Sequence, residues 1–241
     1  MLTDFIFHPD HGKRAFSLVE LLVVLAIVFT LAALAFPVVV RMRENSNATK
    51  CASNLRQIGM AATSWSADND GSIIPCDQGT LPSGSGNVAY WPALLAPYLQ
   101  AEFEFGNPSK QLPIYACPSS ASHFTEEEKK TFFVSYRANQ YGSGKDFSHW
   151  GINYTYLKTS AIDSSTFPLL VDGAPRVPTN WRGWFSSSQS DKDLIGFYHG
   201  GRANRLFVDG HVDSVIKNGW TPMDEGNWKR LGYSGAPPPY Q

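Results

Sequence analysis

The sequence predicts an α+β protein in which a long N-terminal α-helix packs on a mainly antiparallel β-sheet. Three observations support this prediction: a continuous apolar run over residues 16–40, a one-sided apolar repeat over residues 41–70, and the composition of the remainder. The 241-residue chain contains 20 Gly, 16 Pro, 15 Phe, 10 Tyr and 7 Trp. This composition favours a loop-rich domain with strands and an aromatic core over a bundle of helices.

The apolar run over residues 16–40 is long enough to cross a membrane as a helix. Its 25 residues span roughly 38 Å as an α-helix, against about 30 Å for the hydrocarbon core of a bilayer. Glu20 is the only charged residue of the run, and Pro37 is its only strong helix breaker. A carboxylate at membrane depth costs about 2.5–3.5 kcal/mol on insertion scales, so Glu20 needs a partner.

The start of the run suggests what that partner is. The basic pair Lys13–Arg14 and the small residue Ala15 come directly before Phe16. A cut between Ala15 and Phe16 would create an α-amino group four residues from Glu20. An amine and a carboxylate at similar depth neutralise each other, within one chain or between neighbouring chains.

This arrangement resembles the class III signal of bacterial type IV pilins and of the pseudopilins of type II secretion systems. In that signal a basic leader ends in a small residue, Phe follows, and Glu is the fifth residue of an apolar run. Ala15 stands where these proteins usually have Gly, and Pro37 stands where many pilins have a helix-kinking proline. The resemblance implies cleavage by prepilin peptidase after Ala15, N-methylation of Phe16, and filament assembly through Glu20 and Pro37.

Two other interpretations of the N-terminal segment remain open. A simple signal anchor would explain the apolar run, and residues 33–35 (Ala-Leu-Ala) resemble the cleavage site of an ordinary secretory signal. Neither accounts for Glu20 or for the Lys-Arg-Ala-Phe junction. Basic residues flank the run on both sides, at 13–14 and at 41–43, so loop charge does not set the orientation.

After the run, the apolar pattern becomes one-sided. Apolar residues recur at spacings of three and four, which is one face of an α-helix: Ala48, Cys51, Leu55, Ile58, Ala62 and Trp65. We therefore predict a single helix of about 50 residues, ended at 68–71 with Gly71 at the C′ position. The predicted organisation is a leader (1–15), a membrane or filament-core helix (16–40), its amphipathic continuation (41–70) and a β-rich domain (71–241).

In the β-rich part, the sequence predicts a short helix at 90–99 and buried strands at 112–119 and 169–172. A hairpin is predicted at 205–216, with Asp209-Gly210 as a two-residue type I′ turn. His199 followed by nine residues and then Asp209-Gly210 resembles a C-terminal His-x9-Asp-Gly signature of a large bacterial group of pilin-like proteins.

The three cysteines lack the Cys-x-x-Cys spacing of a zinc site or a redox motif. Cys76 and Cys117 both lie beside a proline in the globular part, so a disulfide between them is one interpretation. The alternative is three buried or half-buried thiols, including Cys51.

The sequence offers two candidate metal sites, of which the transition-metal site is rejected and calcium stays possible. His199, Asp209, His211 and Asp213 offer the mixed nitrogen and oxygen ligands that suit transition metals, but Asp209 and Gly210 are needed to form the turn. The simpler interpretation has His199 hydrogen-bonded to nearby backbone.

Calcium is the second metal considered. Three aspartates could supply its oxygen ligands, although their spacing matches no calcium loop: Asp172, Asp191 and Asp193.

We predict a non-enzymatic structural subunit without a cofactor. The sequence has no Gly-x-Ser-x-Gly motif, which would form the nucleophile elbow of a hydrolase. Its net charge of −1 means that it has no surplus of positive charge with which to bind nucleic acid. Its expected partners are pilin-like subunits, prepilin peptidase, an inner-membrane assembly platform and lipid. The precursor is expected in the bacterial inner membrane as a single-pass protein, with its globular domain periplasmic or on the filament. The alternative is a membrane-anchored module that binds a glycan through its tryptophans.

Overall fold

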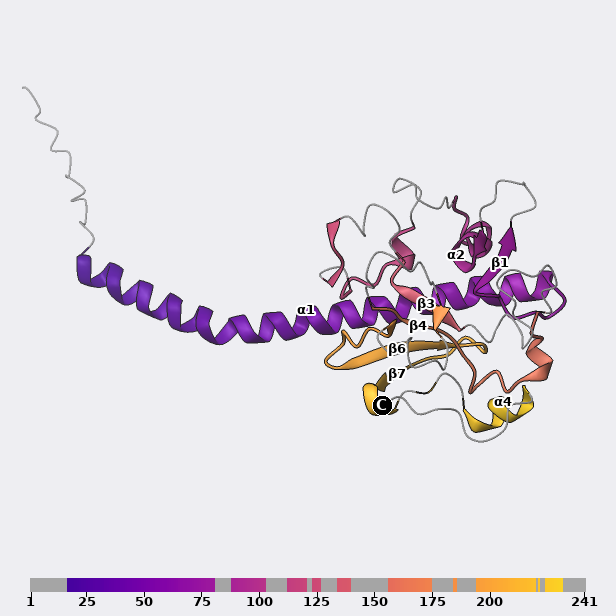
Figure 1. Cartoon of the computed structure of the whole chain (residues 1–241). Helices are drawn as coiled ribbons and strands as arrows, with labels where there is room; N and C mark the ends of the chain where they lie inside the picture. The colour runs from indigo at the N-terminus through magenta and orange to yellow at the C-terminus, as the bar shows by residue number, and fades with distance from the viewer. Residues whose placement is uncertain are drawn as a thin grey trace, which may run out of the picture. The chain divides into compact units, whose positions relative to one another are not determined.

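The structure is a computed structural model (Figure 1). It describes residues 17–80, 88–102, 112–120, 123–126, 134–139, 156–174, 184–185, 194–219, 221 and 224–231. By its internal contacts the chain divides into two compact units, Met1–Arg43 and Glu44–Gln241.

The longest element is a single helix, α1 (Leu18–Asp68), of 51 residues. The predicted continuous helix is therefore confirmed. Of its predicted apolar face, Cys51, Leu55, Ile58, Ala62 and Trp65 are buried, and Ala48 is half-buried. Tertiary packing of this face accounts for the helical second half better than intrinsic propensity does.

The end of α1 differs from the prediction by one residue. The Gly71 N–H donates to the Ser66 carbonyl at 2.9 Å, and Asp70 has a positive φ of 53°. A bond from C″ to C3 across a left-handed C′ residue is a Schellman motif, which places Asp70 at C′ and Gly71 at C″. Aspartate is one of the few residues apart from glycine that tolerate this conformation.

The main sheet belongs to the unit Glu44–Gln241 and has five strands in the order β5-β3-β4-β6-β7. Its strands are β3 (Tyr136–Asn139), β4 (Pro168–Asp172), β5 (Trp184–Phe185), β6 (Arg202–Phe207) and β7 (Val212–Ile216). The pairs along β3-β4-β6-β7 are antiparallel, and β5 joins β3 in parallel. The predicted α+β class is confirmed.

The smaller elements come before, between and after the main strands. A two-stranded antiparallel sheet pairs β1 (Asp77–Thr80) with β2 (Val88–Tyr90). The helices are α2 (Trp91–Leu95) and α4 (Glu225–Arg230), with 3-10 turns at Ala96–Leu99, Pro113–Tyr115, Thr159–Ala161 and Lys217–Gly219.

The core lies between the second half of α1 and the sheet (Figure 1). Leu55 and Ile58 of α1 belong to the same buried cluster as Tyr136, Leu170 and Leu206 of the strands. Removing this apolar surface from water is the main force that holds the helix on the sheet.

A glycine lets α1 approach the sheet closely. A Cβ atom added at Gly59 would lie 2.8 Å from Leu206 Cδ1 on β6 and 3.6 Å from the Gly210 Cα. The helix therefore meets the hairpin at a position where a side chain would collide with a buried leucine.

Two local predictions in the β-rich part are wrong. Residues 112–119 form a 3-10 turn at Pro113–Tyr115 and no strand. Pro113 occupies the start of that turn because its fixed φ suits a helical first position.

The second correction concerns the hairpin, whose strands are confirmed. The Gly210 N–H donates to the Phe207 carbonyl at 3.0 Å, and the Phe207 N–H donates to the His211 carbonyl at 2.9 Å. Gly210 has a φ of 91°, whereas Asp209 does not have a positive φ. The connection is therefore a three-residue loop with one left-handed glycine, which is the next most common hairpin after the two-residue types.

A disulfide joins Cys51 of α1 to Cys117, with 4.9 Å between the Cα atoms, and the buried Cys76 is in no disulfide. Both interpretations of the cysteines, a Cys76–Cys117 disulfide and three thiols, are thus wrong. Cys51 is on the apolar face of α1, and that face brings it to Cys117 across 66 residues of sequence.

Candidate functional site

Ser17 and Glu20 cap the N-terminus of α1. The Ser17 backbone N–H donates to Glu20 Oε2 at 2.9 Å, and the Val19 N–H donates to Ser17 Oγ at 3.3 Å. This is a capping box, in which two side chains satisfy N–H groups that the first helical turn leaves without partners. The Ser-x-x-Glu spacing before an apolar run is a known sequence signal for this motif, and it was not among the features from which the helix was predicted.

The Glu20 carboxylate is therefore held beside the residue that directly follows Phe16. Ala15 and Phe16 lie outside the described residues. Cleavage between them, and the pairing of the new amine with Glu20, stay predictions.

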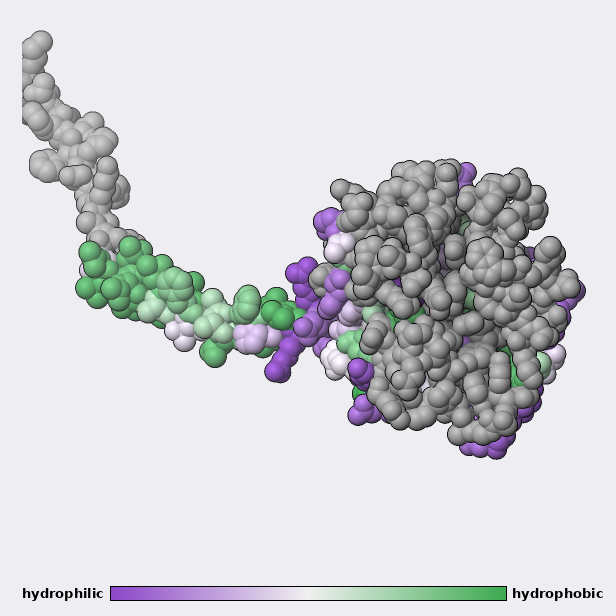
Figure 2. Space-filling model, in the orientation of Figure 1, coloured by the Kyte–Doolittle hydropathy of each residue, from purple (hydrophilic) through white to green (hydrophobic). Residues whose placement is uncertain are grey.

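The first half of α1 exposes its apolar side chains. Among the described residues, α1 is the one helix long and apolar enough to cross a membrane. Its large apolar residues from Leu18 to Val40 are exposed within the chain, and Figure 2 shows their continuous hydrophobic surface. Pro37 lies inside this segment, where it lacks the N–H that would bond the Ala33 carbonyl.

A second candidate site surrounds His199, which sits in a tight turn before β6. Backbone bonds join His199 and Arg202 in both directions, at 3.1 and 3.2 Å. The two central residues, Gly200 and Gly201, have φ of 62° and 80°. A type I′ turn requires positive φ at both central positions. The type I′ turn that was predicted at Asp209-Gly210 is therefore found at Gly200-Gly201.

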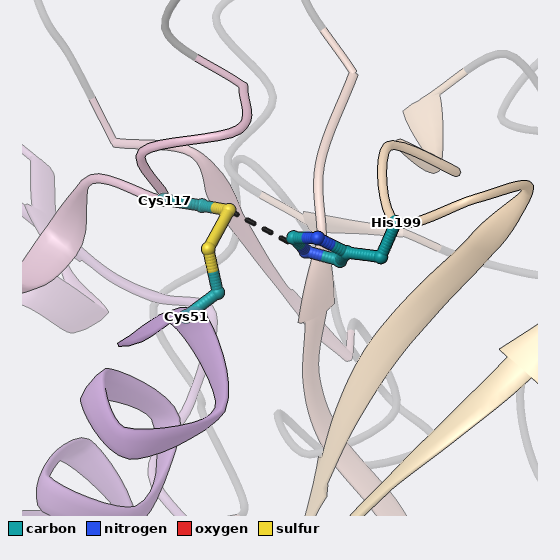
Figure 3. A group of neighbouring side chains, drawn as sticks. All are labelled: Cys51, Cys117 and His199. Atoms are coloured by element: carbon teal, nitrogen blue, oxygen red, sulfur yellow. Dashed lines mark hydrogen bonds between the residues drawn. A yellow bond between two sulfur atoms is a disulfide. The ribbon is translucent and has the colours of Figure 1, made fainter. Parts of the chain in front are cut away.

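The His199 ring is directed into the domain, where its side chain is only 6% exposed. Its Nε2 lies 3.1 Å from Asp172 Oδ2. The same atom lies 3.5 Å from Cys117 Sγ (Figure 3). These two contacts of the ring are with side chains, whereas a hydrogen bond to nearby backbone was expected.

Asp172, at the end of β4, is fully buried, and burial raises the pKa of its carboxyl group. The hydrogen bond and charge of His199 and the backbone N–H of Asn204, 2.6 Å from Oδ2, act in the opposite direction. Within the described part of the chain, Asp172 Oδ1 and His199 Nδ1 have no hydrogen-bond partner. A buried polar atom without a partner is uncommon and marks a candidate site.

The other residues considered for a metal are used in the hairpin. Asp209 Oδ1 accepts the His211 N–H at 3.1 Å and lies 2.6 Å from His211 Nδ1. Arg205 donates to Asp213 twice, from Nε to Oδ1 at 2.8 Å and from Nη2 to Oδ2 at 2.5 Å. For calcium, Asp172 is beside His199, whereas Asp191 and Asp193 lie outside the described residues.

The comparison with protein families matches the N-terminal segment. Residues 10–36 match the family described as the prokaryotic N-terminal methylation motif. The segment thus carries the N-terminal motif that type IV pilin-like precursors have. No curated protein and no solved structure matches the chain.

A pilin-like precursor is a structural protein and not usually an enzyme. The motif implies processing by prepilin peptidase, a membrane anchor and assembly with other pilin-like subunits. The matched residues include Ala15, Phe16 and Glu20 and end one residue before Pro37. The His-x9-Asp-Gly spacing at 199–210 lies outside the match and remains a resemblance.

Proposed function

We propose that this chain is a structural subunit of a filament of the type IV pilus or type II secretion kind. Prepilin peptidase cuts it between Ala15 and Phe16, and Phe16 is then N-methylated. The precursor is a single-pass protein of the bacterial inner membrane with its folded domain on the periplasmic side, from which an assembly platform draws it into the filament. The methylation motif over residues 10–36 is the observation that supports this.

Glu20 is the assembly residue of this proposal. Its carboxylate is directed at the chain end, because Oε2 accepts the N–H of Ser17, the second residue after cleavage. The Phe16 amine of the same or a neighbouring subunit then neutralises it, which removes the unfavourable energy of an unpaired charge in an apolar filament core.

N-terminal sequencing and intact mass of the protein recovered from cells test the cleavage. We expect a chain that begins at methylated Phe16 when prepilin peptidase is present and at Met1 when the peptidase gene is deleted. A chain that begins after Ala35, or at Met1 in both strains, would contradict the proposal.

Substitutions at Glu20 and Ser17 separate the charge from the helix cap. Glu20→Gln keeps a side-chain oxygen for the Ser17 N–H but removes the charge, so we expect membrane insertion and cleavage to continue while filament yield falls at least tenfold. Ser17→Ala removes the hydroxyl cap and keeps the charge, so its yield should stay within about twofold of wild type, since a cap contributes only about 1 kcal/mol.

Sheared filaments measured by immunoblot give these yields. Normal filament yield from Glu20→Gln would show that the carboxylate acts as a cap alone.

A further inference from the structure

Three metal-ligating side chains converge inside the domain. Cys51 Sγ, Cys117 Sγ and His199 Nε2 all lie within 4.8 Å of one another (Figure 3). Both cysteines are 0% exposed, and the His199 side chain is 6% exposed. Three separate segments build this cluster, and no other cysteine or histidine among the described residues belongs to it.

A fourth donor stands beside them. Asp172 Oδ2 lies 3.1 Å from the same Nε2 atom, so the sulfur and the carboxylate oxygen approach one ring nitrogen. A histidine that relays a proton uses its two nitrogens on opposite partners. Thiolate sulfur, imidazole nitrogen and carboxylate oxygen are the three donor types that zinc accepts in proteins.

One distance already matches an edge of a tetrahedral zinc site, and the two sulfurs would have to move apart once the disulfide is opened. With zinc bonds of about 2.3 Å to sulfur and about 2.0–2.1 Å to nitrogen, the sulfur–nitrogen edge of the tetrahedron is about 3.5 Å. The distance between Cys117 Sγ and His199 Nε2 is 3.5 Å. The two sulfurs are 2.09 Å apart in the disulfide and would separate to about 3.8 Å around zinc.

We propose that the reduced chain binds one Zn²⁺ through Cys51, Cys117, His199 Nε2 and Asp172 Oδ2. Reduction of the disulfide adds two electrons and two protons and gives two thiols, and Zn²⁺ then displaces those two protons. In the cell the thiols exist before a disulfide oxidant has removed two electrons and two protons. Zinc and disulfide are therefore alternative links between α1 and the domain, and this inference does not depend on filament assembly.

Metal titration of the full-length protein in detergent micelles tests the proposal. The disulfide is first reduced with a water-soluble phosphine, which is oxidised to the phosphine oxide by taking the oxygen atom of one water molecule. The excess phosphine is then removed under anaerobic conditions, so that the thiols do not reoxidise. Co²⁺ should then give one equivalent of a thiolate-to-cobalt charge-transfer absorption, and Zn²⁺ should displace it with release of bound Co²⁺.

The oxidised protein is the first control, because it carries the same sequence and lacks thiolates. We expect its Zn²⁺ affinity to be at least 100-fold weaker, with no charge-transfer absorption. Equal affinity of the two forms, or a reduced protein that gives no charge-transfer absorption, overturns the site.

Matched substitutions assign the ligands. His199→Ala and Asp172→Asn should each weaken zinc binding by at least tenfold, and circular dichroism of the oxidised variants checks that they fold. His211→Ala and Cys76→Ser change a histidine and a cysteine outside the cluster and should bind zinc as wild type does. Loss of binding in Cys76→Ser, or unchanged binding in His199→Ala, contradicts this ligand set.

Discussion

At Asp163, two hydrogen bonds from one serine favour the ionised form of an exposed carboxyl group. The Ser165 hydroxyl and the Ser165 backbone N–H both bond to Asp163 Oδ1, at 2.6 and 3.1 Å, and they lower the pKa of this carboxyl group. A carboxylate with a lowered folded-state pKa stabilises the fold above its unfolded pKa. That contribution is lost as the pH falls through the folded pKa.

Ser165→Ala should therefore raise the Asp163 pKa toward its ordinary value, because the hydroxyl bond is the largest cause of the shift. An NMR titration of the Asp163 carboxyl in the micelle-bound protein measures it. Ser164→Ala leaves both bonds to Asp163 in place and should leave its titration unchanged. An unchanged pKa in Ser165→Ala would mean that the hydroxyl bond does not lower the pKa of Asp163.

The cysteines show the limit of sequence reasoning for single residues. The apolar repeat placed Cys51 on the buried face of α1, and that assignment is right. The pairing could not be read from the sequence, since Cys51 and Cys117 meet only through the packing of α1 in the folded domain. The same holds for His199, whose contact with Asp172 depends on the meeting of the Gly200-Gly201 turn and the end of β4.

Among the elements, α1 and the hairpin were predictable because their patterns are long and regular. The 3.6-residue repeat identified the helix, and the apolar residues around a glycine turn identified β6 and β7. Short elements were less accessible: the run at 112–119 has apolar residues for a strand, but Pro113 starts a 3-10 turn instead. The parallel partner β5 depends on chain topology, which no local pattern encodes.

The contact between α1 and β6 gives a test at this scale. Gly59→Leu places a side chain where a Cβ alone would come within 2.8 Å of Leu206 Cδ1. We expect the free energy of unfolding to fall by about 1–3 kcal/mol, which is typical of overpacking a well-filled core.

Urea unfolding in micelles, followed by tryptophan fluorescence, measures this loss. The neighbouring Met60 is 65% exposed, so Met60→Leu should change stability by less than about 0.5 kcal/mol. A Gly59→Leu protein as stable as wild type would show that the helix does not press on the sheet here.

At the scale of the whole molecule, the Cys51–Cys117 disulfide is the one covalent cross-link that the described residues contain. It closes a loop with a sequence separation of 66 residues, and a link across a loop of that size stabilises a fold by about 4 kcal/mol in the chain-entropy model. Cys117→Ser, with chelator present, should lower the free energy of unfolding of the oxidised protein by about this amount.

Cys76→Ser is the matched control, since Cys76 is buried but in no disulfide. It should retain the Cys51–Cys117 link, seen as one thiol fewer in a denaturing thiol assay, and should lose less stability than Cys117→Ser. Equal losses in the two variants would contradict the assigned pairing.

The position of Cys51 along α1 also determines how a pulling force on the N-terminal half of the helix is transmitted to the folded domain. Tension applied to the apolar half reaches the folded unit, which begins at Glu44, and meets the sulfur bridge within two helical turns. From Cys51 the bridge passes tension directly to Cys117, so the intervening chain, including the last third of α1, is bypassed. A subunit pulled by its N-terminal helix would therefore resist unfolding through a covalent bond. Only reduction of the disulfide in the absence of zinc would transfer the force to the packing of Leu55 and Ile58.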